Sequence, residues 1–149
     1  MRNKRLIRLS IALASALTFA ACGNDNGDSG DDDGGDGCTV TASFTSIHDD
    51  LLSTPTCATS SCHAAPTNAG GLDFSAGAAN VHGQLVGAPS EYSQATRPTR
   101  IEAGTSTASW FYVKISEPLP PGGRMPSGGA LSQCDIDNIR DWIDAGASQ

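Results

Sequence analysis

The chain has 149 residues, and its 16 Asp and Glu against nine Lys and Arg give a formal net charge of −7. This length suits one domain once the ends are set aside, and no internal repeat indicates a second. Cleavage before Cys22 would leave five Lys and Arg against 16 Asp and Glu, a net charge of −11. So acidic a balance argues against a nucleic-acid partner, because the phosphates would be repelled.

Residues 1–21 predict an exported protein. Basic residues near the start are followed by an apolar run from Leu9 to Ala21, which is typical of a signal peptide and too short to span a membrane. The run ends in Phe19-Ala20-Ala21-Cys22, which resembles a bacterial lipobox whose cysteine becomes the lipidated first residue. We therefore expect a lipoprotein of the bacterial cell envelope, anchored to a membrane at Cys22 and facing the periplasm or the cell exterior. Plain secretion is the alternative.

Residues 22–37 predict a disordered tether behind the lipidated cysteine. From Gly23 to Gly37 the sequence has six Asp, six Gly and no apolar side chain, so nothing in it can bury surface to offset chain entropy. A calcium site is the alternative, but the Asp-x-Asp-x-Asp-Gly alternation with a closing Glu is missing. The folded domain is therefore expected over residues 38–149.

Four helical segments are predicted in this domain. The first covers 43–52 with Ser43 as its cap, and the second covers 76–86. The third covers 109–115, although its aromatic and β-branched residues also suit a strand. The last begins after a Ser132 cap and places four apolar residues on one face, which are Ile136, Ile139, Trp142 and Ile143.

The stretch Cys57-Ala58-Thr59-Ser60-Ser61-Cys62-His63 carries the chemistry. Two thiols can add across the vinyl groups of a porphyrin, and a histidine directly after the second thiol then becomes an axial ligand of the iron. The usual spacing places two residues between the cysteines, and here there are four. The motif therefore predicts a variant haem-attachment site.

The apolar core of the domain is small. Large aliphatic residues and Phe make up 19 of the 112 residues of 38–149, so a haem or a disulfide is expected to complete the core. The two cysteines of the domain that lie outside the motif, Cys38 and Cys134, are expected to form that disulfide, because the chain is predicted to be exported.

Met125 is the candidate for the second axial ligand. It is the only Met beyond the predicted cleavage site, and it lies in a Pro- and Gly-rich loop over 117–129 rather than in a periodic element. Met and His form a recognised axial pair for c-type haem. His82 is the fallback ligand. Arg124 is expected to be solvated at the surface, with pairing to a haem propionate as the alternative.

Residues 38–147 resemble a class I-like cytochrome c domain of exported bacterial proteins. The matching pieces are an N-terminal helix, Cys57-x4-Cys62-His63, Gly-Gly-Leu-Asp-Phe at 70–74, the Trp110 segment, Arg124-Met125-Pro126 and a last helix ending Trp142-Ile143-Asp144-Ala145-Gly146-Ala147. The resemblance implies an all-α fold with the first and last helices packed crosswise around one covalently attached haem c. It also implies thioether links at Cys57 and Cys62, with His63 and Met125 as the axial ligands of the iron.

The leading hypothesis is an electron carrier that binds haem iron, serves an unidentified redox protein and is not an enzyme, with no catalytic residues. The first alternative is a cofactor-free surface lipoprotein in which both cysteine pairs are bridged, acting as a binding module. The second is a zinc site formed by Cys57, Cys62, His63 and a fourth ligand such as His82. It is weakened because the sequence has no second Cys or His pair.

Overall fold

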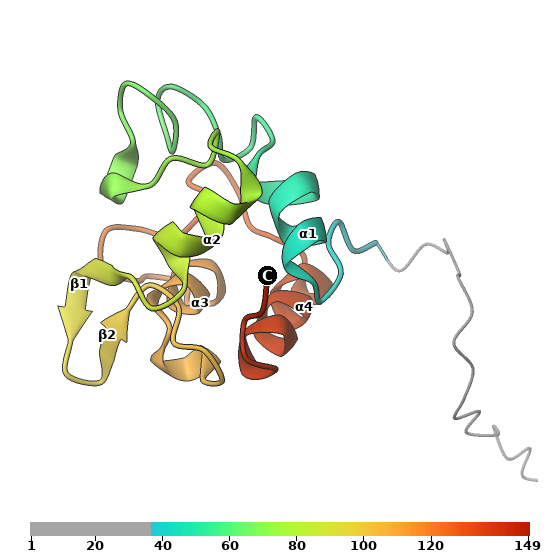
Figure 1. The fold of residues 1–149 in the computed structure, drawn as a ribbon, viewed down its shortest axis with the longest axis vertical. Coiled ribbons are helices and arrows are strands. Elements are labelled where there is room, and N and C mark those ends of the chain that lie inside the picture. Colours follow the sequence, from blue (N-terminus) through green and yellow to red (C-terminus); the bar gives the residue numbers. More distant parts are fainter. Residues whose placement is uncertain (1–36) are drawn as a thin grey trace, which may run out of the picture. The chain divides into compact units, whose positions relative to one another are not determined.

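The computed structural model describes residues 37–149. The predicted signal peptide, the lipidated Cys22 and the tether up to residue 36 lie outside the described residues. The elements shown in Figure 1 are α1 (Phe44–Ser46), η1 (Ile47–Leu52), η2 (Ala69–Gly71), α2 (Ala78–Leu85), β1 (Pro89–Gln94), β2 (Arg97–Thr99), η3 (Ser106–Ala108), α3 (Trp110–Ser116) and α4 (Gln133–Asp144). Within residues 37–149, no helix combines the length and the apolar character that crossing a bilayer requires.

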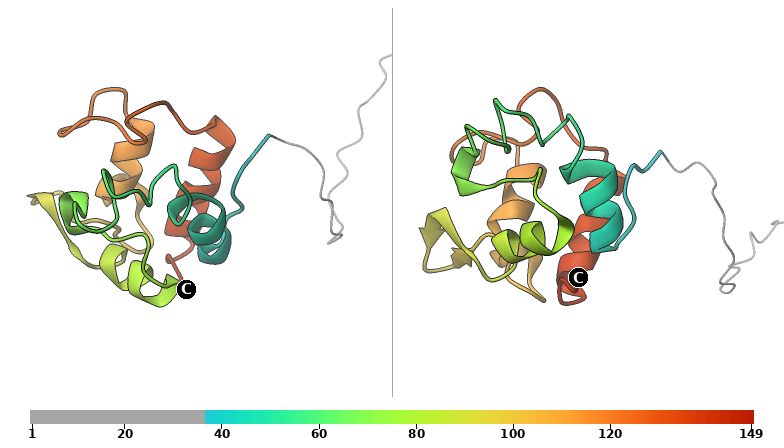
Figure 2. Two further views of the ribbon diagram at one scale, coloured as in Figure 1. Left: turned by 90° about the horizontal axis from the view of Figure 1, so that it is seen from above. Right: turned by 45° about the horizontal axis from the view of Figure 1, so that its top comes forward.

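The first helix, over residues 44–52, lies beside α4. Its N-terminus is capped as predicted, because the Ser43 side chain accepts a hydrogen bond from the Ser46 amide. Its second half, η1, is wound as a π-helix. Figures 1 and 2 show the helix against α4, where the rings of Phe44 and Trp142 stack with their centroids 5.5 Å apart. The two ends of the domain are thus packed together.

The core consists of the helix faces that the apolar spacing predicted. Val81 and Leu85 of α2, and Ile139 and Ile143 of α4, are at most 1% exposed. Burying each such aliphatic side chain stabilises the fold by about 1.5–3 kcal/mol relative to leaving it in water. The predicted segment over 109–115 is the helix α3, which settles the choice between helix and strand at this position.

The prediction of an all-α fold is wrong, because β1 and β2 form a two-stranded antiparallel sheet. Both strands are short and polar, so no apolar alternation marks them in the sequence. A contact with α3 holds them instead. The indole Nε1 of Trp110 donates to the Arg97 carbonyl over 2.9 Å, and its ring packs against Tyr92 with a centroid distance of 5.9 Å. Tertiary packing rather than local preference therefore decides this hairpin.

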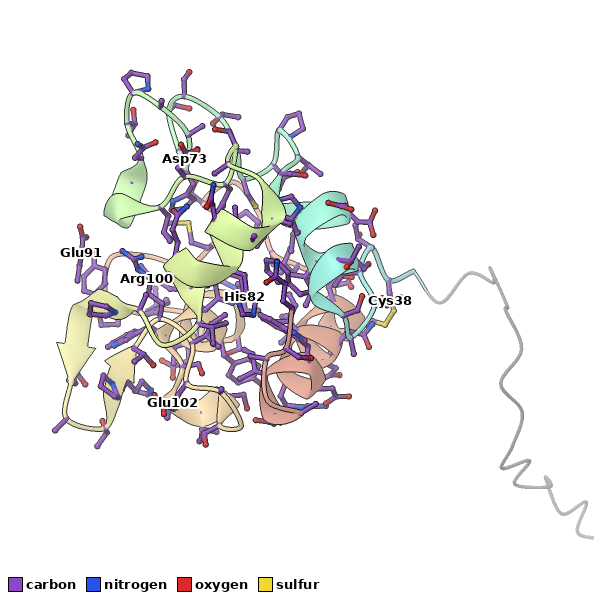
Figure 3. The ribbon with its side chains drawn as sticks, viewed as in Figure 1. Cys38, Asp73, His82, Glu91, Arg100 and Glu102 are labelled. Atoms are coloured by element: carbon purple, nitrogen blue, oxygen red, sulfur yellow. A yellow bond between two sulfur atoms is a disulfide. The ribbon has the colours of Figure 1, made fainter. Side chains whose placement is uncertain are left out.

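The start of the domain is tied to the start of α4. Cys38 and Cys134 form the predicted disulfide, which Figure 3 shows beside α1. The carboxylate of Asp135 is buried, with 3% of the residue exposed, and its Oδ1 accepts from the amides of Thr39 (2.6 Å) and Val40 (2.9 Å). A covalent bond and two charge-assisted hydrogen bonds thus fix the same short segment.

Candidate functional site

A cavity of about 350 Å³ lies beside the loop that follows η1. This loop, β1, α3 and the loop before α4 all contribute to its wall. The wall is mainly apolar, and its large side chains are Leu51, Leu52, Leu72, Phe74, Leu85, Trp110, Phe111, Ile115 and Leu131. The size and the apolar wall are typical of sites for small molecules and cofactors.

This cavity brings together all four residues that the sequence analysis predicted as haem contacts. Cys57, Cys62 and His63 reach it from the loop after η1, and Met125 reaches it from the loop before α4. His63 and Met125 are 62 positions apart in the sequence. They line one cavity only because the fold brings the two loops to the same place.

Backbone hydrogen bonds hold the segment from Cys57 to His63 in a turn. The His63 amide donates to the Cys57 carbonyl over 3.2 Å, and the Cys62 amide donates to the Thr59 carbonyl over 2.9 Å. These bonds fold the four residues of the gap into a compact turn. Both thiols therefore line the same cavity despite the longer spacing.

The ring of His63 is held in one tautomer. Its Nδ1 lies 2.8 Å from the Ala69 carbonyl oxygen, which can only accept, so Nδ1 carries the proton and Nε2 keeps its lone pair. Burial lowers the pKa of His63. The bond to Ala69 opposes this shift, and the charges of Lys114 and Arg100 add to it. Within residues 37–149 no hydrogen bond occupies Nε2, which leaves a neutral imidazole able to bind a metal centre.

The two thiols of the motif are free and differ in acidity. Cys57 and Cys62 are both half-buried and are not joined to each other. Burial raises the pKa of the Cys57 thiol to about 11, and the neighbouring Cys62 adds to the rise. Hydrogen bonds from Thr59 and Ser61 lower the pKa of Cys62 below its usual value. Cys62 therefore carries the larger thiolate fraction at any given pH.

In the haem-free protein at about pH 8, iodoacetamide is expected to alkylate Cys62 at least tenfold faster than Cys57. The thiolate is the reactive form, and a pKa of about 11 leaves Cys57 with about one thiolate in a thousand at that pH. Raising the pH toward 11 increases the thiolate fraction of Cys57 and narrows the difference between the two alkylation rates. Peptide mapping by mass spectrometry over time gives both rates. Equal rates at about pH 8 would contradict this account of the two thiols.

Two cations that the sequence analysis did not single out, Arg100 and Lys114, also line the cavity. Arg100 donates from Nη1 to the Gln84 carbonyl and from Nη2 to the Gly70 carbonyl, each over 2.7 Å. Figure 3 shows Arg100 between α2 and β1. Neither cation forms an ion pair with a carboxylate of the described residues. One feature of the sequence could have pointed to Lys114, because it is the single charged residue in the apolar helix α3.

Arg124 does not reach the cavity. Its Nε and Nη2 donate to the Ile115 carbonyl over 3.2 and 3.0 Å, at the end of α3. It therefore ties the loop before α4 to α3, a role that neither predicted alternative included.

His82, the fallback ligand, lies away from the cavity. Its Nε2 is 2.8 Å from the Ala147 carbonyl oxygen, and its ring meets Phe44 edge-on at a centroid distance of 4.9 Å. Figure 3 shows it between α2 and the C-terminal end of the chain. His48 is also buried, and its Nδ1 pairs with the Asp49 carboxylate at 2.6 Å. The cavity therefore has His63 as its one histidine among the lining residues.

The prediction of a protein that binds haem iron as a metal is wrong as far as the side chains of residues 37–149 show. Among residues 37–149, no group of three or more His, Cys, Asp or Glu side chains is placed to hold a metal ion. The zinc hypothesis fails on the same finding, since His82 does not join Cys57, Cys62 and His63. The described side chains thus give no evidence of bound haem or iron.

Comparisons with protein-family models, with curated proteins and with solved structures found no match. The functional argument therefore rests on the residues and the geometry described above.

Proposed function

We propose that the protein is a c-type haem-binding electron carrier of the bacterial cell envelope, anchored through Cys22. One observation carries the proposal, which is the convergence of Cys57, Cys62, His63 and Met125 on one apolar cavity. Two free thiols, an imidazole with an available nitrogen and a thioether form the donor set of c-type haem with His and Met ligation.

The wall of the cavity suits the rest of such a cofactor. The apolar side chains of the wall match the apolar faces of a macrocycle. Arg100 uses two of its five N–H donors on carbonyls and Lys114 uses two of its three, so both keep donors for ligand carboxylates. The positive charge of the cavity wall is thus available to the propionates that a haem carries.

When bound, the haem would supply one-electron chemistry. The side chains of this chain would hold the haem. The thiols of Cys57 and Cys62 would attach the group, Nε2 of His63 and the Met125 sulfur would bind its iron, and the apolar wall would exclude water. Such a carrier requires no catalytic acid or base. Its acidic charge favours a redox protein with a basic surface, through long-range attraction.

Replacing Met125 with Ala is expected to abolish the weak sulfur-to-iron absorption of the oxidised protein and to lower its reduction potential, since a Met ligand raises the potential. The proteins are produced together with a periplasmic haem-attachment system, and the spectrum and potential are measured. Leu131→Ala is the matched control, because it also removes apolar volume from the cavity wall but leaves the sulfur. A variant M125A with the unchanged wild-type spectrum would show that another group binds the iron.

The cofactor-free alternative is less well supported by the structure. It requires a bridge between Cys57 and Cys62, and both are free cysteines here. It also leaves the orientation of His63, with Nε2 available, without a role.

A further inference from the structure

No helix or strand carries Met125. It lies in the segment between Ser116, where α3 ends, and Gln133, where α4 begins. A backbone hydrogen bond inside this segment, from the Gly123 amide to the Pro120 carbonyl over 2.9 Å, closes a local turn. A local turn shapes the loop but does not fix where the loop lies relative to the cavity. The position of Met125 must therefore be set by contacts with other elements.

Lys114 of α3 supplies three of these contacts. Its Nζ donates to the carbonyls of Pro121 over 2.7 Å and Gly123 over 2.9 Å. Its backbone carbonyl accepts from the Met125 amide over 2.8 Å. The side chain and the backbone of one helical residue thus hold the loop on both sides of residue 124. Hydrogen bonds from a charged donor are stronger than neutral ones, so the ammonium is the stronger part of this clamp.

The loop passes close to Lys114, and a side chain at Gly122 would have to displace the ends of the Tyr92 and Lys114 side chains. A Cβ at this position would lie 2.6 Å from Cζ of Tyr92 and 2.9 Å from Nζ of Lys114, closer than Cβ atoms normally come to other heavy atoms. The φ angle of +72° at Gly122 also favours glycine. The Tyr92 ring lies against the ammonium, with Nζ 4.8 Å from its centroid. The hairpin, α3 and the loop therefore meet at Lys114.

We propose that Lys114 is a positioning residue, which clamps the loop over 117–125 so that Met125 faces the cavity. The inference rests on the proposed function in one respect, because only in that function is Met125 a ligand. The clamp itself is a property of the chain, formed by Lys114, Tyr92 and Gly122. It needs no bound group to be observed.

Two variants break the clamp in different ways. Lys114→Met has a side chain of similar length and removes the three donors. Gly122→Ala keeps the ammonium but adds a Cβ that would displace the ends of the Tyr92 and Lys114 side chains. Lys114→Gln serves as a third variant. Arg140→Gln is the matched control, because it also removes one cation, and Arg140 pairs with Asp137 and Asp141 on α4.

The readout is the ¹³C-methyl resonance of Met125 together with hydrogen exchange at its amide, both measured on the full chain without haem. The sequence contains two methionines, and a Met125→Leu protein assigns the resonance. In K114M and G122A, the resonance is expected to move toward the value of an unfolded chain. Exchange at the amide is expected to become at least about tenfold faster, because the loop opens more often. R140Q is expected to match the wild type in both measurements.

Protection of the Ile139 amide in α4 identifies the variants that remain folded, and the comparison uses those variants. An unchanged resonance with exchange within twofold of wild type in the folded variants of Lys114 would overturn the inference, whatever the result for Gly122→Ala. The haem-loaded protein gives a separate result. K114M is expected to keep its covalent haem and lose the sulfur-to-iron absorption. A wild-type protein that never takes up haem would count against the proposed function and leave the result on the loop standing.

Discussion

Replacing His63 with Phe is expected to lower the amount of haem bound per protein at least tenfold. The ring donates from Nδ1 to Ala69, which leaves Nε2 as the one imidazole nitrogen available in the cavity. Losing an outer contact of a metal-ligating histidine typically costs 10–100-fold in metal affinity, and losing the ligand itself should cost at least as much. Absorbance of the haem relative to total protein, after expression with the attachment system, measures the effect.

His82→Gln is the matched control for this prediction. It removes the other imidazole that was considered as a ligand, and the glutamine amide can still donate to the Ala147 carbonyl. We expect H82Q to bind as much haem as the wild type. Full haem binding by H63F, or its loss in H82Q, would contradict the proposal that His63 would bind the iron.

Removing the disulfide by Cys38→Ser together with Cys134→Ser is expected to lower the free energy of unfolding by about 4–5 kcal/mol. The bond joins residues 96 positions apart. By the chain-entropy estimate, closing a loop of about 100 residues restricts the unfolded chain by about 4.7 kcal/mol. Urea unfolding followed by circular dichroism measures the difference, with both proteins in the same haem state.

The double variant Cys57→Ser with Cys62→Ser is the control for the disulfide, because it also removes two sulfurs but no bond between them. In the haem-free protein we expect it to lower the free energy of unfolding by about 1–2 kcal/mol, because Cys57 is partly buried against the core but no covalent bond is lost. Equal losses of unfolding free energy in the two double variants would show that the loss does not come from breaking the bond between Cys38 and Cys134.

The parts of the fold that the sequence predicted are those with a periodic apolar pattern. In α4, Ile136, Ile139, Trp142 and Ile143 share one face, and that face is buried. The Ser43 cap and the helix after it could also be predicted, because the capping serine and the apolar residues of the helix lie within a few residues of each other. Local preference and tertiary packing agree at these positions.

The hairpin β1–β2 was not predictable in this way. Its residues are polar and exposed for the most part, and what fixes the strands is Trp110 of α3, which contacts both Arg97 and Tyr92. No local pattern encodes a contact with a helix further along the chain. The all-α expectation failed here because none of the motifs that carried the resemblance lies in the hairpin.

The donor residues of the candidate site could be predicted from the sequence, but the residues around them could not. Cys57, Cys62 and His63 form a motif, and Met125 stood out as a Met in a loop. The structure adds that one cavity collects all four. The clamp formed by Lys114 and the position of Arg100 were beyond the sequence, because both depend on carbonyl groups of distant loops whose place only the fold determines.

The most direct test of the central claim is a search for haem that survives denaturation of the protein. The chain is expressed with a periplasmic haem-attachment system, denatured, digested and mapped by mass spectrometry. We predict one haem on the peptide that contains Cys57 and Cys62, with a sulfur–carbon bond at each cysteine. A colourless protein from a host that attaches haem to other proteins, with Cys57 and Cys62 joined as a disulfide, would contradict the account.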